Sequence, residues 1–276
     1  MAVKNTAAAD VVLDESYRGK ASKRRRKKKN AIFYLFLFVL LITVVSITSL
    51  TIFFNIKEIK VSGDVIYSPD EIRQALSIPV GTNMFRIDKF KAVERLTRIL
   101  PYIENAEIKR RLPEVLEVIV TPAKPAVFVE TAGGYVILSD KAKVLKNVTE
   151  KPQLPKLLGS GIVKNTEGEP AVFGSEVLGE LYMSVYSVLR SQNIIDKMTE
   201  INITKRINLT FEYEGRIYVK LGNSDILERK IKFFNYILSE HPENNKAVID
   251  VSGTADKRAT FDDLTDEEYA ALKSNT

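Results

Sequence analysis

Residues 31–54 form an unbroken run of 24 residues without a charged side chain. A helix of this length measures roughly 36 Å at about 1.5 Å per residue, and the hydrocarbon core of a bilayer is about 30 Å thick. The core helix of a soluble protein is usually shorter, and a cleavable signal peptide has an apolar segment of only about 7–15 residues. The run therefore predicts one transmembrane helix that stays in the mature protein.

The positive charge of the chain is concentrated immediately before this run. Residues 1–30 hold ten of the 41 basic residues and three of the 35 acidic residues, so the remainder is close to neutral. The seven consecutive basic residues are Lys23, Arg24, Arg25, Arg26, Lys27, Lys28 and Lys29. Basic residues beside the first membrane helix are retained in the cytoplasm and attract anionic lipid. We expect residues 1–30 to be a disordered cytoplasmic tail, with the residues after the helix outside the cytoplasm.

A basic cluster of this kind is also typical of nuclear-localisation and nucleic-acid-binding segments. Its position beside an apolar run favours the membrane role, and the near-neutral remainder predicts no nucleic-acid partner. The chain has no cysteine and a single histidine, His241. Disulfides are therefore excluded, a conventional zinc site is not expected, and the fold has to be held together by an apolar core.

Residues 55–122 have the pattern of a small α+β domain, in the order strand, helix, helix, strand, strand. The expected ranges are a strand at 59–61, a helix beginning at Ser68, a helix from 88 to 100, and strands at 103–110 and 114–120. The sequence Ser-Pro-Asp-Glu at 68–71 predicts a capping box with proline in the first turn. In the second helix, helical spacing predicts that Phe90 and Leu96 face the sheet.

Residues 123–253 predict a β-rich domain with flanking helices, because short apolar segments alternate with Gly, Pro and Asp turns. The expected strands are 126–130, 135–138, 143–145, 201–204, 209–213, 216–221 and 247–251, and the expected helices are 175–192 and one beginning at Ser224. Residues 154–174 are expected to be a loop. Residues 254–276 lack a core pattern and are expected to form a mobile acidic C-terminal tail.

Four segments together carry a family pattern. They are 59–63 (IKVSG), 81–88 (GTNMFRID), 101–113 (PYIENAEIKRRLP) and 118–125 (VIVTPAKP). In this order, after a short basic tail and one membrane span, they resemble the FtsQ/DivIB family of bacterial cell-division proteins. The resemblance covers residues 31–125 and extends over the rest by layout. It implies an α+β protein with a single transmembrane helix, a POTRA domain at 55–122 and a β domain at 123–253.

The resemblance also implies a function. The chain would be a bitopic scaffold of the divisome, in the cell membrane at the septum, that recruits other bitopic division proteins of the FtsB/DivIC and FtsL type. In the family, a terminal strand of the β domain recruits a partner, and it corresponds here to Ala247, Val248, Ile249, Asp250, Val251 and Ser252. An edge strand offers unpaired N–H and C=O groups to an incoming segment. The residues alone leave open that this strand only completes the core, and Ser252-Gly253 stands where many relatives carry arginine and an aromatic residue.

No residue pattern in the sequence indicates catalysis. No serine is followed three residues later by lysine, the arrangement of penicillin-binding transpeptidases. The segment 159–161 (GSG) lacks the Lys-Ser/Thr of a phosphate-binding loop, and the acidic tail lacks the spacing of an EF-hand. We therefore expect no enzyme activity, cofactor, metal or small-molecule substrate. Two alternatives stay open, a POTRA-bearing component of polypeptide transport or chaperoning and a regulator of a cell-wall enzyme.

Overall fold

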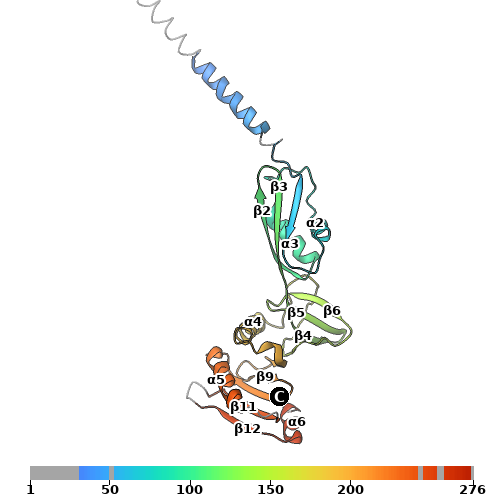
Figure 1. Cartoon of the computed structure of the whole chain (residues 1–276), viewed down its shortest axis with the longest axis vertical. Helices are drawn as coiled ribbons and strands as arrows, with labels where there is room; N and C mark the ends of the chain where they lie inside the picture. Colours follow the sequence, from blue (N-terminus) through green and yellow to red (C-terminus); the bar gives the residue numbers. More distant parts are fainter. Residues whose placement is uncertain (1–30, 50–52, 242–244, 254–257, 275–276) are drawn as a thin grey trace, which may run out of the picture. The chain divides into compact units, whose positions relative to one another are not determined.

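The computed structural model describes residues 31–49, 53–241, 245–253 and 258–274. The chain divides into two compact units, one comprising residues 1–58, 80–86 and 111–115, and the other comprising residues 59–79, 87–110 and 116–276. The labels of Figure 1 are used for the helices and strands. The basic cluster at 23–29 lies outside the described residues.

The first unit contains the apolar helix and short segments joined by backbone hydrogen bonds. The helix covers Ala31–Ser49 with a mean hydropathy of 2.7, and none of its most apolar window is buried by the protein. Its length and composition suit a membrane span. Beyond it, the Ile56 N–H donates to Thr82 O at 3.0 Å and the Met84 N–H to Phe54 O at 2.9 Å. Phe54 therefore belongs to the folded part rather than to the membrane helix, although the predicted span included it.

A three-stranded sheet with strand order β1-β3-β2 follows. Its elements are β1 (Glu58–Ser62), α2 (Pro69–Leu76), α3 (Lys89–Ile99), β2 (Ile103–Arg111) and β3 (Val115–Pro122). This is the predicted order along the chain, so the α+β class is confirmed here. The capping box of α2 is present, because the Ser68 N–H donates to Glu71 Oε2 at 2.7 Å and the Glu71 N–H to Ser68 Oγ at 3.3 Å.

The buried face of α3 differs from the predicted one. Leu96 is 0% exposed and Ala92 is buried, whereas Phe90 is 89% exposed. Ala92 and Leu96 are four residues apart and share one face of the helix, and Phe90 lies about 200° around the helix from Ala92. The prediction that Leu96 is buried is confirmed, and the prediction that Phe90 faces the sheet is wrong.

The rest of the chain builds a nine-stranded sheet in the order β12-β11-β10-β9-β8-β7-β4-β5-β6. Its strands are β4 (Pro125–Thr131), β5 (Gly134–Ser139), β6 (Val144–Val148), β7 (Lys156–Leu158), β8 (Met198–Asn202), β9 (Leu209–Tyr213), β10 (Ile217–Gly222), β11 (Ala247–Asp250) and β12 (Thr260–Asp263). The pairs β4/β7, β7/β8 and β10/β11 are parallel. Strands β6 and β12 are the two edges. The predicted loop at 154–174 contains β7, which is too short to give a sequence pattern.

Two helices, α4 (Glu176–Ser191) and α5 (Leu227–Glu240), cover one face of this sheet, and a 3-10 turn, η1 (Ile195–Lys197), leads into β8. The core is dense in aromatic rings: Phe234 of α5 meets Phe211 edge-on with ring centroids 5.2 Å apart and Tyr213 at 5.4 Å. The predicted helix at 175–192 is confirmed. Helix α5 begins two residues later than predicted, because Ile226 rather than Ser224 is its N-cap residue.

The C-terminal residues have regular structure. Strand β12 pairs antiparallel with β11, and α6 (Asp266–Ser274) follows. A second capping box begins α6, because the Thr265 N–H donates to Glu268 Oε2 at 2.9 Å and the Glu268 N–H to Thr265 Oγ1 at 3.3 Å. Tyr269 of this helix is buried. The prediction of a mobile tail is therefore wrong for residues 260–274, and residues 254–257 and 275–276 lie outside the described residues.

Candidate functional site

The strand predicted to dock a partner is not an edge strand. β11 lies between β10 and β12, in parallel register with one and antiparallel register with the other. Ile249 and Val251 are 0% exposed and belong to the core. Of the other predicted site residues, Ala247 is buried, Val248 and Asp250 are half-buried, and Ser252 is exposed. The prediction of a terminal edge is wrong, and Ile249 and Val251 do complete the core.

The backbone of β11 turns alternate residues toward its two neighbours. The Val251 N–H donates to Lys220 O, on the β10 side, at 2.9 Å. On the other side, the Leu264 N–H donates to Lys246 O at 2.8 Å. Because successive residues of a strand alternate, the N–H of Val248 points toward β12. Strand β12 thus covers the backbone groups of β11 that an incoming strand would use.

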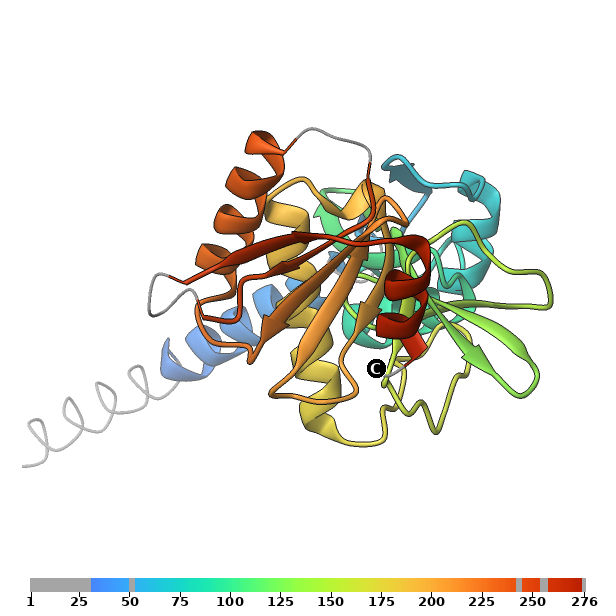
Figure 2. The same ribbon diagram turned by 90° about the horizontal axis from the view of Figure 1, so that it is seen from below.

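The sheet face opposite α4 and α5 carries a row of residues from neighbouring strands. Directly opposed across the strands are Lys156, Glu200, Glu212, Tyr218 and Val248. Residues adjacent to them along the strands, such as Phe211, face the core, so the row points to the other side. Helix α6 lies on this second face, and Figure 2 shows it as the dark red helix, across the sheet from α4 and α5.

Glu212 is the point at which α6 is attached. The residue is 6% exposed, and its carboxylate accepts hydrogen bonds from Thr199 Oγ1 at 2.6 Å, Tyr269 OH at 2.7 Å and Lys273 Nζ at 2.9 Å. Burial alone raises the pKa of Glu212, but these three hydrogen bonds outweigh burial and lower it. Burial, together with the hydrogen bond to Glu212, raises the pKa of Tyr269 well above its ordinary value. Glu212 is therefore an ionised acceptor, and α6 supplies two of its three donors.

Two further contacts hold the C-terminal segment. The rings of His241 and Phe261 are stacked with centroids 4.1 Å apart. The Lys246 ammonium lies 2.6 Å from Asp266 Oδ1 and 5.5 Å from the centre of the Tyr269 ring. The Asp266 side chain is largely exposed, and an exposed ion pair contributes only about 0–1 kcal/mol. The sequence gives His241 no role, and in the structure it stacks with Phe261, the aromatic residue of β12.

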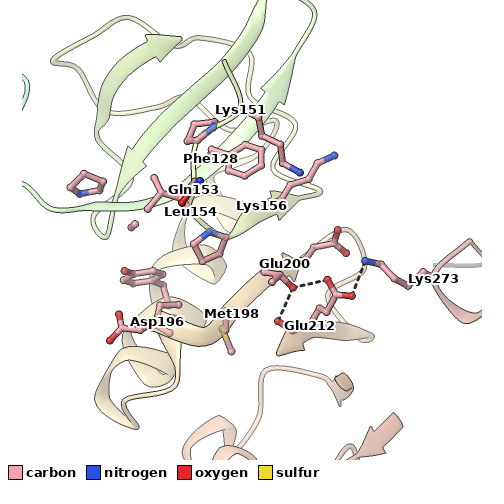
Figure 3. A pocket seen from close by; sticks show the side chains of 17 residues that line it. Phe128, Lys151, Gln153, Leu154, Lys156, Asp196, Met198, Glu200, Glu212 and Lys273 are labelled. Carbon is pink, nitrogen blue, oxygen red and sulfur yellow. Dashed lines mark hydrogen bonds and ion pairs between the residues drawn. The ribbon is translucent and has the colours of Figure 1, made fainter. Parts of the chain in front are cut away.

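A pocket of about 690 Å³ opens beside α6 (Figure 3). Residues that line it include Phe128, Lys151, Leu154, Lys156, Met198 and Glu200. The Lys151 ammonium is 5.9 Å from the centre of the Phe128 ring, and Lys156 Nζ is 2.5 Å from Glu130 Oε2. The walls thus combine apolar surface with charges of both signs.

Two of the carboxylates that line this pocket, Glu200 and Glu212, have pKa values shifted in opposite directions. Burial raises the pKa of Glu200, and the charge of Glu212 raises it further, although Lys273 opposes the shift. Opposite shifts in a pair of carboxylates are one signature of acid–base catalysis. Glu212, however, already accepts three hydrogen bonds and is not free to take a proton from a substrate. In the part of the chain that the structure describes, no group of three or more acidic residues or histidines is placed to hold a metal ion.

Lys143 is another buried titratable residue, away from this face. Burial lowers its pKa to about 8, a shift that also marks nucleophilic lysines. Its ammonium, however, donates to Thr97 O at 2.7 Å and to Ile103 O at 2.6 Å. Both contacts are with backbone carbonyls, so Lys143 has a structural role and is not placed as a nucleophile.

Sequence reasoning missed Glu212, Tyr269 and Lys273. One signal was Glu212 as the single charged residue in strand β9, because a charge buried there needs partners. Another was the Thr-Asp-Glu-Glu sequence at 265–268, which has capping-box spacing, with Tyr269 and Lys273 four residues apart on the following helix. Nothing in the sequence connects the two signals, since 57 residues separate Glu212 from Tyr269.

The fold and the site define a class of protein: a helix suited to a membrane, followed by a three-stranded sheet and a mixed nine-stranded sheet in which the C-terminal strand β12 covers β11. Comparison with protein families agrees with this description. A model described as "POTRA domain, FtsQ-type" matches residues 54–121, and one described as "Cell division protein FtsQ/DivIB, C-terminal" matches residues 127–252.

Similar proteins have the same family names. "Cell division protein DivIB" of Clostridium botulinum (strain Hall) is 27% identical over 253 residues, which covers 88% of this chain and 94% of the relative. "Cell division protein DivIB" of Clostridium acetobutylicum is 27% identical over 203 residues, with 72% and 80% covered. "Cell division protein FtsQ" of Corynebacterium glutamicum is 24% identical over 155 residues, with 56% and 68% covered. The chain belongs to the FtsQ/DivIB family of cell-division proteins, which confirms the resemblance.

Proposed function

We propose that this protein is a bitopic scaffold of the division machinery that acts by binding and not by catalysis. The apolar helix anchors it in the cell membrane, and the extracytoplasmic part recruits and stabilises other bitopic division proteins, of the FtsB/DivIC and FtsL type, at the septum. In this proposal residues 55–122 form a POTRA domain that positions the protein, and residues 123–253 form a β domain that binds its partners. The relatives' names support a division role.

The observation that carries the binding mechanism is the C-terminal end of the nine-stranded sheet. The edge strand β12 is short, and its side chains are exposed or half-buried. The helix that follows it donates hydrogen bonds to the buried carboxylate of Glu212. Pairing of backbone groups gives an incoming strand affinity, and the side chains on alternate positions give it selectivity. We therefore assign partner docking to this end of the sheet. The N–H and C=O groups of Val248 and Asp250 point toward β12 and would be open to a partner strand only when β12 is displaced.

Val248→Pro is expected to abolish co-purification of division proteins from cross-linked dividing cells. Proline removes the N–H that points toward β12 and leaves the β10 side of the strand intact. The matched control is Asn147→Pro at the opposite edge, where the Asn147 N–H donates to Glu167 Oε1 at 2.8 Å and not to another strand. This control is expected to keep its partners. Normal co-purification by a folded Val248→Pro protein would exclude the β11–β12 end as the docking site.

Orientation has a separate test. A reporter that is active only outside the cytoplasm should be active when fused after Thr276 and inactive when fused before Ala31, because the basic cluster at 23–29 is retained in the cytoplasm. Neutral substitutions of that whole cluster should produce a mixed orientation. Substitutions of the same number of surface lysines after the helix are the control and should leave orientation unchanged. Activity of the N-terminal fusion alone would overturn both the orientation and the extracytoplasmic docking site.

A further inference from the structure

The C-terminal segment 258–274 adds little to the core of the sheet that it covers. In β12 only Phe261 is half-buried and the other three residues are exposed. In α6 the single buried residue is Tyr269. Strand β11 beneath it has Ile249 and Val251 fully buried against α5 and the neighbouring strands. The apolar core is therefore largely complete at β11, and β12 contributes mainly backbone hydrogen bonds.

The family match also separates the sheet up to β11 from the segment that contains β12 and α6. The C-terminal family model matches residues 127–252 and ends two residues after β11. The segment that pairs with β11 thus begins beyond the matched domain. An uncovered β11 would present a row of unpaired N–H and C=O groups, which is the surface to which strands of other chains add.

The attachment of α6 is polar and can be replaced by donors from another chain. Glu212 accepts from Thr199 in the sheet and from Tyr269 and Lys273 in α6. A buried carboxylate that loses two donors is costly unless other donors take their place. Water or a partner's hydroxyl and ammonium groups would meet this need when α6 leaves.

From these contacts we infer that β12 and α6 form a strap that occupies the partner's docking surface, and that the partner displaces it. The partner segment makes the same kinds of contact as the strap that it replaces. It is an extended stretch of about four residues with an aromatic side chain that stacks on His241, followed by a short helix that brings a hydroxyl and an ammonium group to Glu212. The inference rests on the proposed function, because it names the segment that the scaffold binds.

Locking the strap tests this inference in the full chain. Val248 and Asp262 are directly opposed in the β11–β12 pair, and cross-strand partners lie about 4.5–5.5 Å apart between Cα atoms, a distance that a disulfide can bridge. The chain has no cysteine of its own, so the double variant Val248→Cys/Asp262→Cys forms a single defined bond. The matched control is Ile137→Cys/Lys146→Cys in the β5–β6 pair, away from the strap.

The probe is a labelled peptide with the sequence of residues 258–276, added to the purified full chain in detergent. A second variant, Tyr269→Phe/Lys273→Met, removes both hydrogen bonds that hold the chain's own strap to Glu212. It should bind this peptide at least roughly a hundredfold tighter than the unchanged chain, the change expected from losing two hydrogen bonds to a charged group. The oxidised Val248→Cys/Asp262→Cys variant should not bind the peptide, and reduction of its disulfide should restore binding. Equal binding by the oxidised and reduced lock would overturn the strap.

Two further outcomes separate the inference from the proposed function. If division proteins co-purify equally with the oxidised and the reduced Val248→Cys/Asp262→Cys variant, the proposed scaffold function is retained and the strap inference is wrong. If no division protein co-purifies with the unchanged chain, the proposed scaffold function is wrong, whatever the result with the peptide. A dimer of the Tyr269→Phe/Lys273→Met chain in light scattering would assign the surface to a second copy that exchanges straps, and would overturn a different protein as the occupant.

Discussion

Val251→Pro is expected to unfold the nine-stranded sheet. The Val251 N–H donates to Lys220 O at 2.9 Å, and the side chain is buried in the core between the sheet and α5. Proline removes this donor, leaves a buried carbonyl without its partner and places a ring where a packed side chain was, so a loss of about 3 kcal/mol or more in the free energy of unfolding is expected. Total stability of a domain is about 5–15 kcal/mol, so the loss is a large part of it.

Urea unfolding of the purified full chain, followed by tyrosine circular dichroism, measures this loss. Val251→Ala is the comparison that removes most of the side chain and keeps the N–H. Asp250→Pro, whose N–H points to the β12 side, is the positional control and should cost clearly less. If Val251→Pro unfolds at the same urea concentration as the unchanged chain, the parallel pairing of β10 and β11 is wrong.

Leu96→Ala should destabilise the three-stranded sheet by about 2–5 kcal/mol, the range for a leucine truncated in a core. Leu96 is fully buried on the face of α3 that it shares with Ala92. Phe90→Ala removes a larger side chain from the same helix but should change stability by no more than about 0.5 kcal/mol, because Phe90 is almost wholly exposed.

The same urea titration of the two variants compares them directly. A cost for Phe90→Ala equal to that of Leu96→Ala would restore the helix face predicted from the sequence and would contradict the orientation of α3. A normal transition for Leu96→Ala would show that α3 does not contribute to the core at all.

Local signals in the sequence predicted most of the elements. The capping serine at 68, the proline at 101 and the turns at 133–134 and 214–215 each place the end or the reversal of an element. The face of α3 was harder, because apolar residues at 90, 93, 96 and 100 drift around the helix and do not define a single stripe. Burial of Leu96 rather than Phe90 is decided by the sheet against which the helix packs.

Whether a strand lies inside a sheet or at its edge is not a local property. The alternation at 247–251 reads the same in both cases, and the difference lies in β12, a four-residue strand with a single apolar residue. The helix that follows β12, α6, contacts Glu212, which is far away in the sequence. The site therefore could not be assembled from residue patterns, although the strand at its centre could be named.

The parallel pairing of β10 with β11 also bears on when the protein can work. Two parallel strands cannot be joined by a tight turn, so the chain must first pass through α5 before β11 can take its place. A chain is synthesised from its N-terminus, so its N-terminal segments leave the ribosome and fold first. Strands β11 and β12 follow the other strands of this sheet along the chain, so they are synthesised after them. If partners dock at this end of the sheet, as proposed, a nascent chain lacks its docking surface until α5 and these two strands have been made.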